Sequence, residues 1–158
     1  MKLFLLDTNI NIGYIRGSNY AKYVEKKFNL FDPDNISVIS MVSVAEIKSL
    51  AYKFGWGKKK KGIMNDLLKA IPVVKINSEK IIDSYSEIDA YNNLKHPTKK
   101  NPAGTSVIKI PQNDIWIAAT AQTLNATLIS TDKHFEHLNK VFINFIYIDQ
   151  SLKEEDAE

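Results

Sequence analysis

The feature that most constrains the fold is a regular alternation of short apolar runs and longer amphipathic stretches along the 158 residues. Apolar and β-branched runs predict buried strands at residues 3–6, 36–40, 73–76, 127–130 and 142–148. Apolar residues at helical spacing predict helices at residues 22–31, 43–54, 63–70, 78–94, 113–124 and 133–138. Short strands that lack a polar face and alternate with helices are typical of a parallel sheet covered on both sides. We therefore predict an α/β fold with three layers (α/β/α) and a central, mostly parallel sheet.

Length and composition limit the chemistry. We predict one domain over residues 1–150, followed by a frayed acidic tail over residues 151–158. The absence of cysteine excludes disulfides, thiolate metal sites and a cysteine nucleophile. The apolar run at residues 3–6 is too short for a signal peptide, and no window reaches the ~18 apolar residues of a membrane-spanning helix. We therefore expect a cytoplasmic protein with no membrane partner.

Four acidic residues follow predicted strands. Asp7 and Asp132 come directly after the strands at 3–6 and 127–130, Glu46 lies one turn into the helix after 36–40, and Asp114 opens the helix at 113–124. In a parallel sheet these positions share one edge, so the carboxylates converge if their strands are neighbours. Converging carboxylates repel one another unless a cation neutralises them. Mg²⁺ and Mn²⁺ prefer such oxygen ligands and can promote phosphodiester hydrolysis.

Each of these acids also has an ordinary structural interpretation. Ser43 and Glu46 match the S-x-x-E capping box, so Glu46 could serve only to cap its helix. Asp114 complements the helix dipole from the first turn, and Asp7 and Asp132 could be N-caps. For each residue taken alone, the catalytic and the structural interpretations both stay open.

Other signals in the sequence are weaker. His134 and His137 are three residues apart, but no third ligand is nearby, so we do not expect a zinc site. Trp116 is interpreted as a core residue. An aspartate-based phosphatase would need an acid two residues after Asp7, where this chain has Asn9, which argues against that class of enzyme.

The chain resembles the PIN domain, the nuclease fold of VapC-type toxins. The resemblance covers about residues 2–148 and rests on four segments in order: residues 6–10 (Leu-Asp-Thr-Asn-Ile), 43–47 (Ser-Val-Ala-Glu-Ile), 113–119 (Asn-Asp-Ile-Trp-Ile-Ala-Ala) and 130–135 (Ser-Thr-Asp-Lys-His-Phe). It implies an endoribonuclease that depends on Mg²⁺ or Mn²⁺ and leaves a 5′-phosphate and a 3′-hydroxyl. It also implies RNA as substrate, with tRNA as a candidate, a co-expressed antitoxin partner and a homodimer.

The resemblance also implies roles for individual residues. Asp7 and Asp114 would bind the metal directly, whereas Glu46 and Asp132 would bind through water or hold a second ion. The residues that would orient ligands or the attacking water are Thr8, Asn9 and Ser130. One departure is the loop at residues 96–112, which is longer than in compact toxins and rich in lysine. It leaves open whether the chain pairs with an antitoxin in the usual way. The alternatives to a toxin are a stand-alone PIN nuclease and a non-catalytic PIN-like module that binds RNA or protein.

The net charge of +3 is unevenly distributed along the chain. Residues 151–158 carry −3, so residues 1–150 carry +6. Two clusters supply candidate contacts to RNA phosphates: Lys58, Lys59, Lys60, Lys61, Lys99 and Lys100. A solvated helix start is the alternative for residues 58–61. We expect RNA binding to be sensitive to salt and to weaken when residues 58–61 are neutralised.

Overall fold

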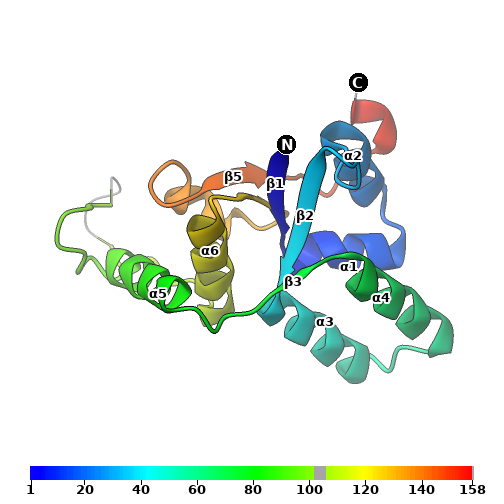
Figure 1. Ribbon diagram of the computed structural model, residues 1–158, viewed down its shortest axis with the longest axis horizontal. Coiled ribbons are helices and arrows are strands. Elements are labelled where there is room, and N and C mark those ends of the chain that lie inside the picture. Colours follow the sequence, from blue (N-terminus) through cyan, green and yellow to red (C-terminus); the bar gives the residue numbers. More distant parts are fainter. Residues whose placement is uncertain (102–105, 158) are drawn as a thin grey trace.

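The computed structural model describes residues 1–101 and 106–157, in which strands and helices alternate as expected (Figure 1). The strands are β1 (Lys2–Leu6), β2 (Asn35–Ser40), β3 (Val73–Val74), β4 (Thr127–Ser130) and β5 (Asn144–Tyr147). The α-helices are α1 (Thr8–Arg16), α2 (Asn19–Phe28), α3 (Met41–Lys53), α4 (Lys58–Ala70), α5 (Glu79–Asn92) and α6 (Gln112–Leu124). Two 3₁₀ helices, η1 (Lys133–Leu138) and η2 (Glu154–Ala157), complete the described elements.

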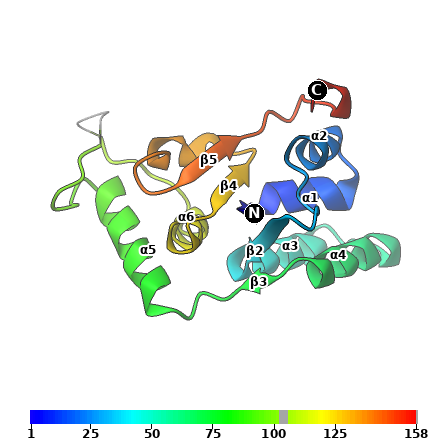
Figure 2. The ribbon, with the colours of Figure 1, turned by 45° about the horizontal axis from the view of Figure 1, so that its top comes forward.

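All five strands form one parallel sheet in the order β3-β2-β1-β4-β5. The central strand β1 pairs with β2 on one side and β4 on the other, so that Leu5 lies opposite both Val38 and Leu128. Helices α1 to α4 cover one face of the sheet, and α5, α6 and η1 cover the other (Figure 2). The predicted three-layer α/β/α fold is confirmed.

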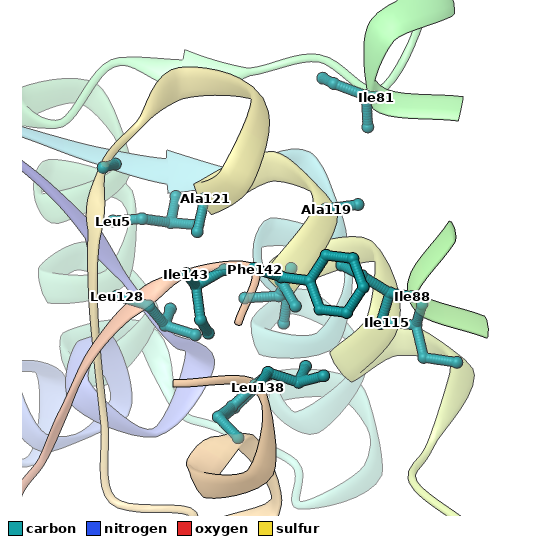
Figure 3. Packing of buried hydrophobic residues seen from close by; sticks show 14 of the residues in the cluster. Leu5, Ile81, Ile88, Ile115, Ala119, Ala121, Leu128, Leu138, Phe142 and Ile143 are labelled. Atoms are coloured by element: carbon teal, nitrogen blue, oxygen red, sulfur yellow. The ribbon is translucent and has the colours of Figure 1, made fainter. Parts of the chain in front are cut away.

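Alternate residues of the central strands supply two separate hydrophobic cores. Leu5 and Leu128 pack against α5, α6 and η1, in the cluster shown in Figure 3. Leu6 and Ile129 point to the opposite face and pack against α1, α3 and α4. All four side chains are fully buried. Burial on both faces explains why these strands read as continuous apolar runs.

The structure differs from the prediction most clearly in helix α1, which the sequence pattern did not reveal. Its residues include several isoleucines and asparagines, whose helix propensity is low. Tertiary burial stabilises it instead, because Ile10, Ile12 and Ile15 pack into the core beside Leu6. Within the described residues, no helix combines the length and apolarity needed to cross a bilayer.

The C-terminal tail is another correction. We expected residues 151–158 to be frayed, whereas the described part forms η2 and packs against α2. Ala157 is only 9% exposed, and Leu152 packs against the core cluster that contains Leu6. Two small apolar contacts therefore anchor a segment whose composition is otherwise acidic and polar.

Candidate active site

A cleft of about 750 Å³ opens at the carboxyl edge of the sheet and is lined by all four predicted acids: Asp7, Glu46, Asp114 and Asp132. They meet because β2, β1 and β4 are neighbours in the sheet. Glu46 follows β2, Asp7 follows β1 and Asp132 follows β4, whereas Asp114 comes from the first turn of α6. The topological condition for their convergence is therefore met.

Asp7 forms the floor of the cleft and is only 3% exposed. It is the N-cap of α1, and its carboxylate accepts a hydrogen bond from the Thr8 backbone N–H at 2.7 Å. The other carboxylate oxygen accepts a hydrogen bond from the Ser130 hydroxyl at the end of β4. The Ser130 contact ties the ends of β1 and β4 together, and the two contacts jointly orient the Asp7 carboxylate.

Glu46 is not a helix cap. The N-cap of α3 is Ser40, whose hydroxyl accepts from the Val42 backbone N–H at 3.2 Å, so Ser43 lies inside the helix. Glu46 instead accepts a hydrogen bond from the Thr8 hydroxyl and another, at 2.9 Å, from the Asn113 side-chain amide. The capping-box interpretation of Glu46 is therefore wrong, and its carboxylate is directed into the acidic cluster.

Asp132 and Asp114 lie nearer the rim of the cleft, with side chains 33% and 14% exposed. Asp132 caps η1 by accepting from the His134 backbone N–H at 2.9 Å, and its own N–H donates to the Ser130 hydroxyl. The His134 ring nitrogen Nδ1 lies 3.2 Å from Asp132 Oδ2 and 3.3 Å from Asp114 Oδ2. The imidazole thus bridges the two rim acids.

The electrostatics of the cleft favour a bound cation. Burial raises the pKa of Asp7 to about 7, and repulsion from Asp114 and Glu46 adds to this, against hydrogen bonds from Ser130 and Thr8 that lower it. Burial, followed by repulsion from Asp132 and Glu46, raises the pKa of Asp114 to about 6, against the lowering contact with His134. Carboxylates that resist ionisation in this way fit a hard divalent cation, which would stabilise their charged forms.

Sequence reasoning missed Asn113 and Lys53, which line the cleft, and His134, which contacts two of its acids. Asn113 and His134 lie inside the third and fourth acidic segments. Asn113 contacts Glu46 of the second segment, and His134 contacts Asp132 of its own segment. Lys53 shares a helical face with Glu46 and Leu50, so the i, i+4, i+7 spacing on the predicted helix could have revealed it. Trp116, expected in the core, is half-buried, lines the cleft and stacks on Tyr85.

The structure does not bring the predicted RNA-contact lysines into the cleft. Residues 58–61 begin α4, beyond the end of α3 that is remote from Glu46 (Figure 1). Lys60 and Lys61 lie over the rings of Trp56 and Tyr52. Lys99 lies over the ring of Phe142, and Lys100 follows it in the loop. Part of that loop, residues 102–105, lies outside the described residues.

The three predicted orienting residues all lie near the acids. Thr8 and Ser130 hydrogen-bond directly to Glu46 and Asp7, and Asn9 lines the cleft. The acids thus sit in a network of fixed polar contacts that spans the ends of three adjacent strands.

The sequence model of the PIN domain family matches residues 4–141, which is most of the chain. The chain belongs to the PIN domain family. PIN domains are nucleases, and the matched segment includes all four acids of the cleft. No curated protein matches the chain.

Solved structures show the same fold. A chain of VapBC2 from Rickettsia felis, bound to a promoter DNA fragment, is 22% identical with a TM-score of 0.71, over 93% of this chain and 99% of that one. A chain of VapBC-1 from nontypeable Haemophilus influenzae is 26% identical with a TM-score of 0.67, over 92% and 97% of the two chains. A chain of VapBC-5 from Mycobacterium tuberculosis, described as a toxin-antitoxin system, is 14% identical with a TM-score of 0.57, over 93% and 99%.

Proposed function

We propose that the protein is a divalent-metal-dependent endoribonuclease and the toxin of a toxin–antitoxin pair. The observation that carries this proposal is a buried carboxylate, Asp7, held beside Asp114 and Glu46 at the floor of an open cleft. A purely structural residue would gain nothing from this repulsion. A residue that binds a cation would gain from it, because the bound ion attracts the carboxylates that otherwise repel one another.

The chain's own residues orient the carboxylates of this site. Ser130 and the Thr8 backbone hold Asp7, and Thr8 and Asn113 hold Glu46. Mg²⁺ or Mn²⁺ held by these carboxylates would supply Lewis-acid stabilisation of the charge that develops on a phosphodiester. We expect Asp7 and Asp114 to bind the ion directly, and Glu46 and Asp132 to bind through water or to hold a second ion.

The shape of the cleft suits a strand of nucleic acid. The acids and Lys53 line the same cleft, and Lys53 lies about two turns along α3 from Glu46. If one phosphate of the strand is held near the acids, the Lys53 ammonium group is placed to contact a neighbouring phosphate. Hydrolysis by water would break the P–O3′ bond, leaving a 3′-hydroxyl and a 5′-phosphate.

The antitoxin partner is proposed from the structural neighbours, because VapBC-5 is described as a member of a toxin-antitoxin family. We also propose a homodimer and the cytoplasm as the site of action, where cellular RNA is available. We expect a small neighbouring gene that encodes a DNA-binding protein, and we expect that protein to co-purify with this chain. If no such gene exists, the chain is better described as a stand-alone nuclease.

The decisive test is cleavage of total RNA and of purified tRNA by the chain freed of partners. We expect cleavage with Mg²⁺ or Mn²⁺, none with EDTA, and products that carry a 5′-phosphate. Asp7→Asn should abolish cleavage, because asparagine can still cap α1 but cannot supply a carboxylate. Asp66→Asn is the matched control, since Asp66 is an exposed acid on α4 outside the cleft.

Two results would contradict the proposal. Cleavage that persists in EDTA and in Asp7→Asn would place the activity elsewhere or in a contaminant. No cleavage with either metal, by a chain that remains folded, would favour a non-catalytic binding module with a PIN fold.

A further inference from the structure

His134 adds a nitrogen donor to a site otherwise built from oxygen. Its Nδ1 lies 3.2 Å from Asp132 Oδ2 and 3.3 Å from Asp114 Oδ2. One ligand atom from each of these three residues can be chosen so that all lie within 4.8 Å of one another. The imidazole therefore faces the same space as the two rim carboxylates.

Two hydrogen bonds hold the backbone that carries this imidazole. The His134 N–H donates to Asp132 Oδ1 at 2.9 Å, and the N–H of Asp132 in turn donates to the Ser130 hydroxyl at 2.9 Å. The next residue, Phe135, is fully buried and anchors η1 to the core. His134 is thus held at the rim by the same strand end that presents Asp132.

The spacing of the donor atoms matches that of neighbouring ligands around one ion. An ion with bonds of about 2.1 Å to its ligands spaces adjacent octahedral ligands by about 3.0 Å, and tetrahedral ligands by about 3.4 Å. The distances from His134 Nδ1 to the two carboxylate oxygens fall between these values. The third distance, between ligand oxygens of Asp114 and Asp132, is within 4.8 Å, so the three donors can converge on one cation.

We infer that His134 is a metal ligand of the cleft and that it shifts the preference of the site from Mg²⁺ towards a first-row transition ion such as Mn²⁺. Mg²⁺ is bound chiefly by oxygen, whereas imidazole nitrogen suits transition ions. The inference rests on the proposed function only in that it requires a cation in this cleft. It adds that the ion is distinguished by a nitrogen ligand.

The other two histidines provide an internal comparison. His137 directs Nε2 to Asn92 at 2.7 Å, with its ring stacked beside Tyr91. His96 Nδ1 accepts from the Lys99 backbone N–H at 2.9 Å, and its ring packs edge-on against Phe142. Of the three, His134 alone has its nitrogen among the carboxylates of the cleft in the described structure.

The test is pulsed electron paramagnetic resonance of Mn²⁺ bound to the untagged full-length chain. We expect nitrogen modulation from a coordinated imidazole, and its replacement by the ¹⁵N pattern when only histidine is ¹⁵N-labelled. His134→Asn should remove the signal, whereas His96→Asn should keep it. Competition between the ions should show the preference for Mn²⁺ over Mg²⁺ falling about tenfold in His134→Asn and staying unchanged in His96→Asn.

The outcomes separate this inference from the proposed function. Mn²⁺ bound to the wild-type chain without imidazole modulation would overturn the role of His134 as ligand and leave it as a hydrogen-bond donor to the two acids. Failure of the wild-type chain to bind Mn²⁺ at all would overturn the metal site itself. The wild-type spectrum decides the question even if His134→Asn does not fold.

Discussion

The same two strands, β1 and β4, contribute to two different regions of the molecule. Their apolar residues fill the hydrophobic cores, and the residues that follow their carboxyl ends line the acidic cleft. Leu5 and Leu6 are fully buried in the two apolar cores, and the next residue, Asp7, is an equally buried carboxylate. The apolar residues lower the free energy of the fold, whereas burial and repulsion raise the pKa of Asp7 to about 7. Adjacent residues therefore have different roles. The apolar side chains stabilise the fold, whereas the carboxylates at the strand ends repel one another, and a bound cation can relieve that repulsion.

The largest effect that separates these regions is on activity. Asp7→Asn should abolish RNA cleavage, a loss of about 1000-fold or more, because it removes a carboxylate that would hold the ion at the reacting phosphate. Its free energy of unfolding at pH 8 without metal should be no lower than that of the wild-type chain, since a repelled buried charge is lost. Cleavage assays and urea titration measure the two quantities. A large loss of stability together with activity would mean that Asp7 serves the fold.

The core should respond in the opposite way. Leu128→Ala removes a fully buried side chain between the sheet and α6 and should lower the free energy of unfolding by about 3 kcal/mol. At a temperature where the variant is folded, the cleavage that remains should need the same metal concentration as in the wild-type chain. A large change in that concentration would show that the core and the cleft are energetically coupled.

A pH titration of stability sharpens the comparison. The pKa of Asp7 is raised in the folded chain from its ordinary value of 3.8 to about 7, so the folded state binds more protons between these values. Stability without metal should therefore fall as the pH rises from 5 to 8, by on the order of 2 kcal/mol. Urea unfolding in EDTA should show this slope in the wild-type chain and a shallower one in Asp7→Asn. An equal slope in both would assign the effect to other groups.

The smallest effect is expected from the lysines outside the cleft. Replacing residues 58–61 with glutamine should weaken RNA binding and make it less salt-dependent, because contacts to phosphates are lost. The loss should be only about threefold, because α4 begins away from the acids. Fluorescence anisotropy in an Asp7→Asn background measures binding without cleavage. Unchanged affinity would identify the run as solvated surface, and a loss as large as that from neutralising Lys53 would extend the binding surface to α4.

Much of the fold could be predicted because each strand carries its own signal. The strand at 127–130 and the short helix at 133–138 match the structure residue for residue. Helix α1 escaped prediction because isoleucine and asparagine favour other local structures, whereas burial beside Leu6 stabilises the helix. The tail escaped because its anchor, Ala157, has no local signal.

The candidate site could be predicted in its acids but not in its contacts. Strand ends of a parallel sheet converge by geometry, so Asp7 and Asp132 could be placed together from sequence once their strands were assumed to be neighbours. The choice between capping and catalytic roles for Glu46 depended on where α3 begins, and Ser40 rather than Ser43 caps it. The bridge from His134 to Asp114 joins separate elements, which no local pattern encodes.

The most direct test of the central claim is calorimetric titration of the metal-free chain with Mn²⁺ at pH 7, repeated in buffers of different ionisation heat. Asp7 and Asp114, with pKa values of about 7 and about 6, are partly protonated there, so binding should release roughly half a proton per chain. Asp66→Asn should behave like the wild-type chain, and Asp7→Asn should bind weakly and release fewer protons. Absence of binding by the folded wild-type chain, or equal binding by Asp7→Asn, would contradict a cation site built on the acidic strand ends.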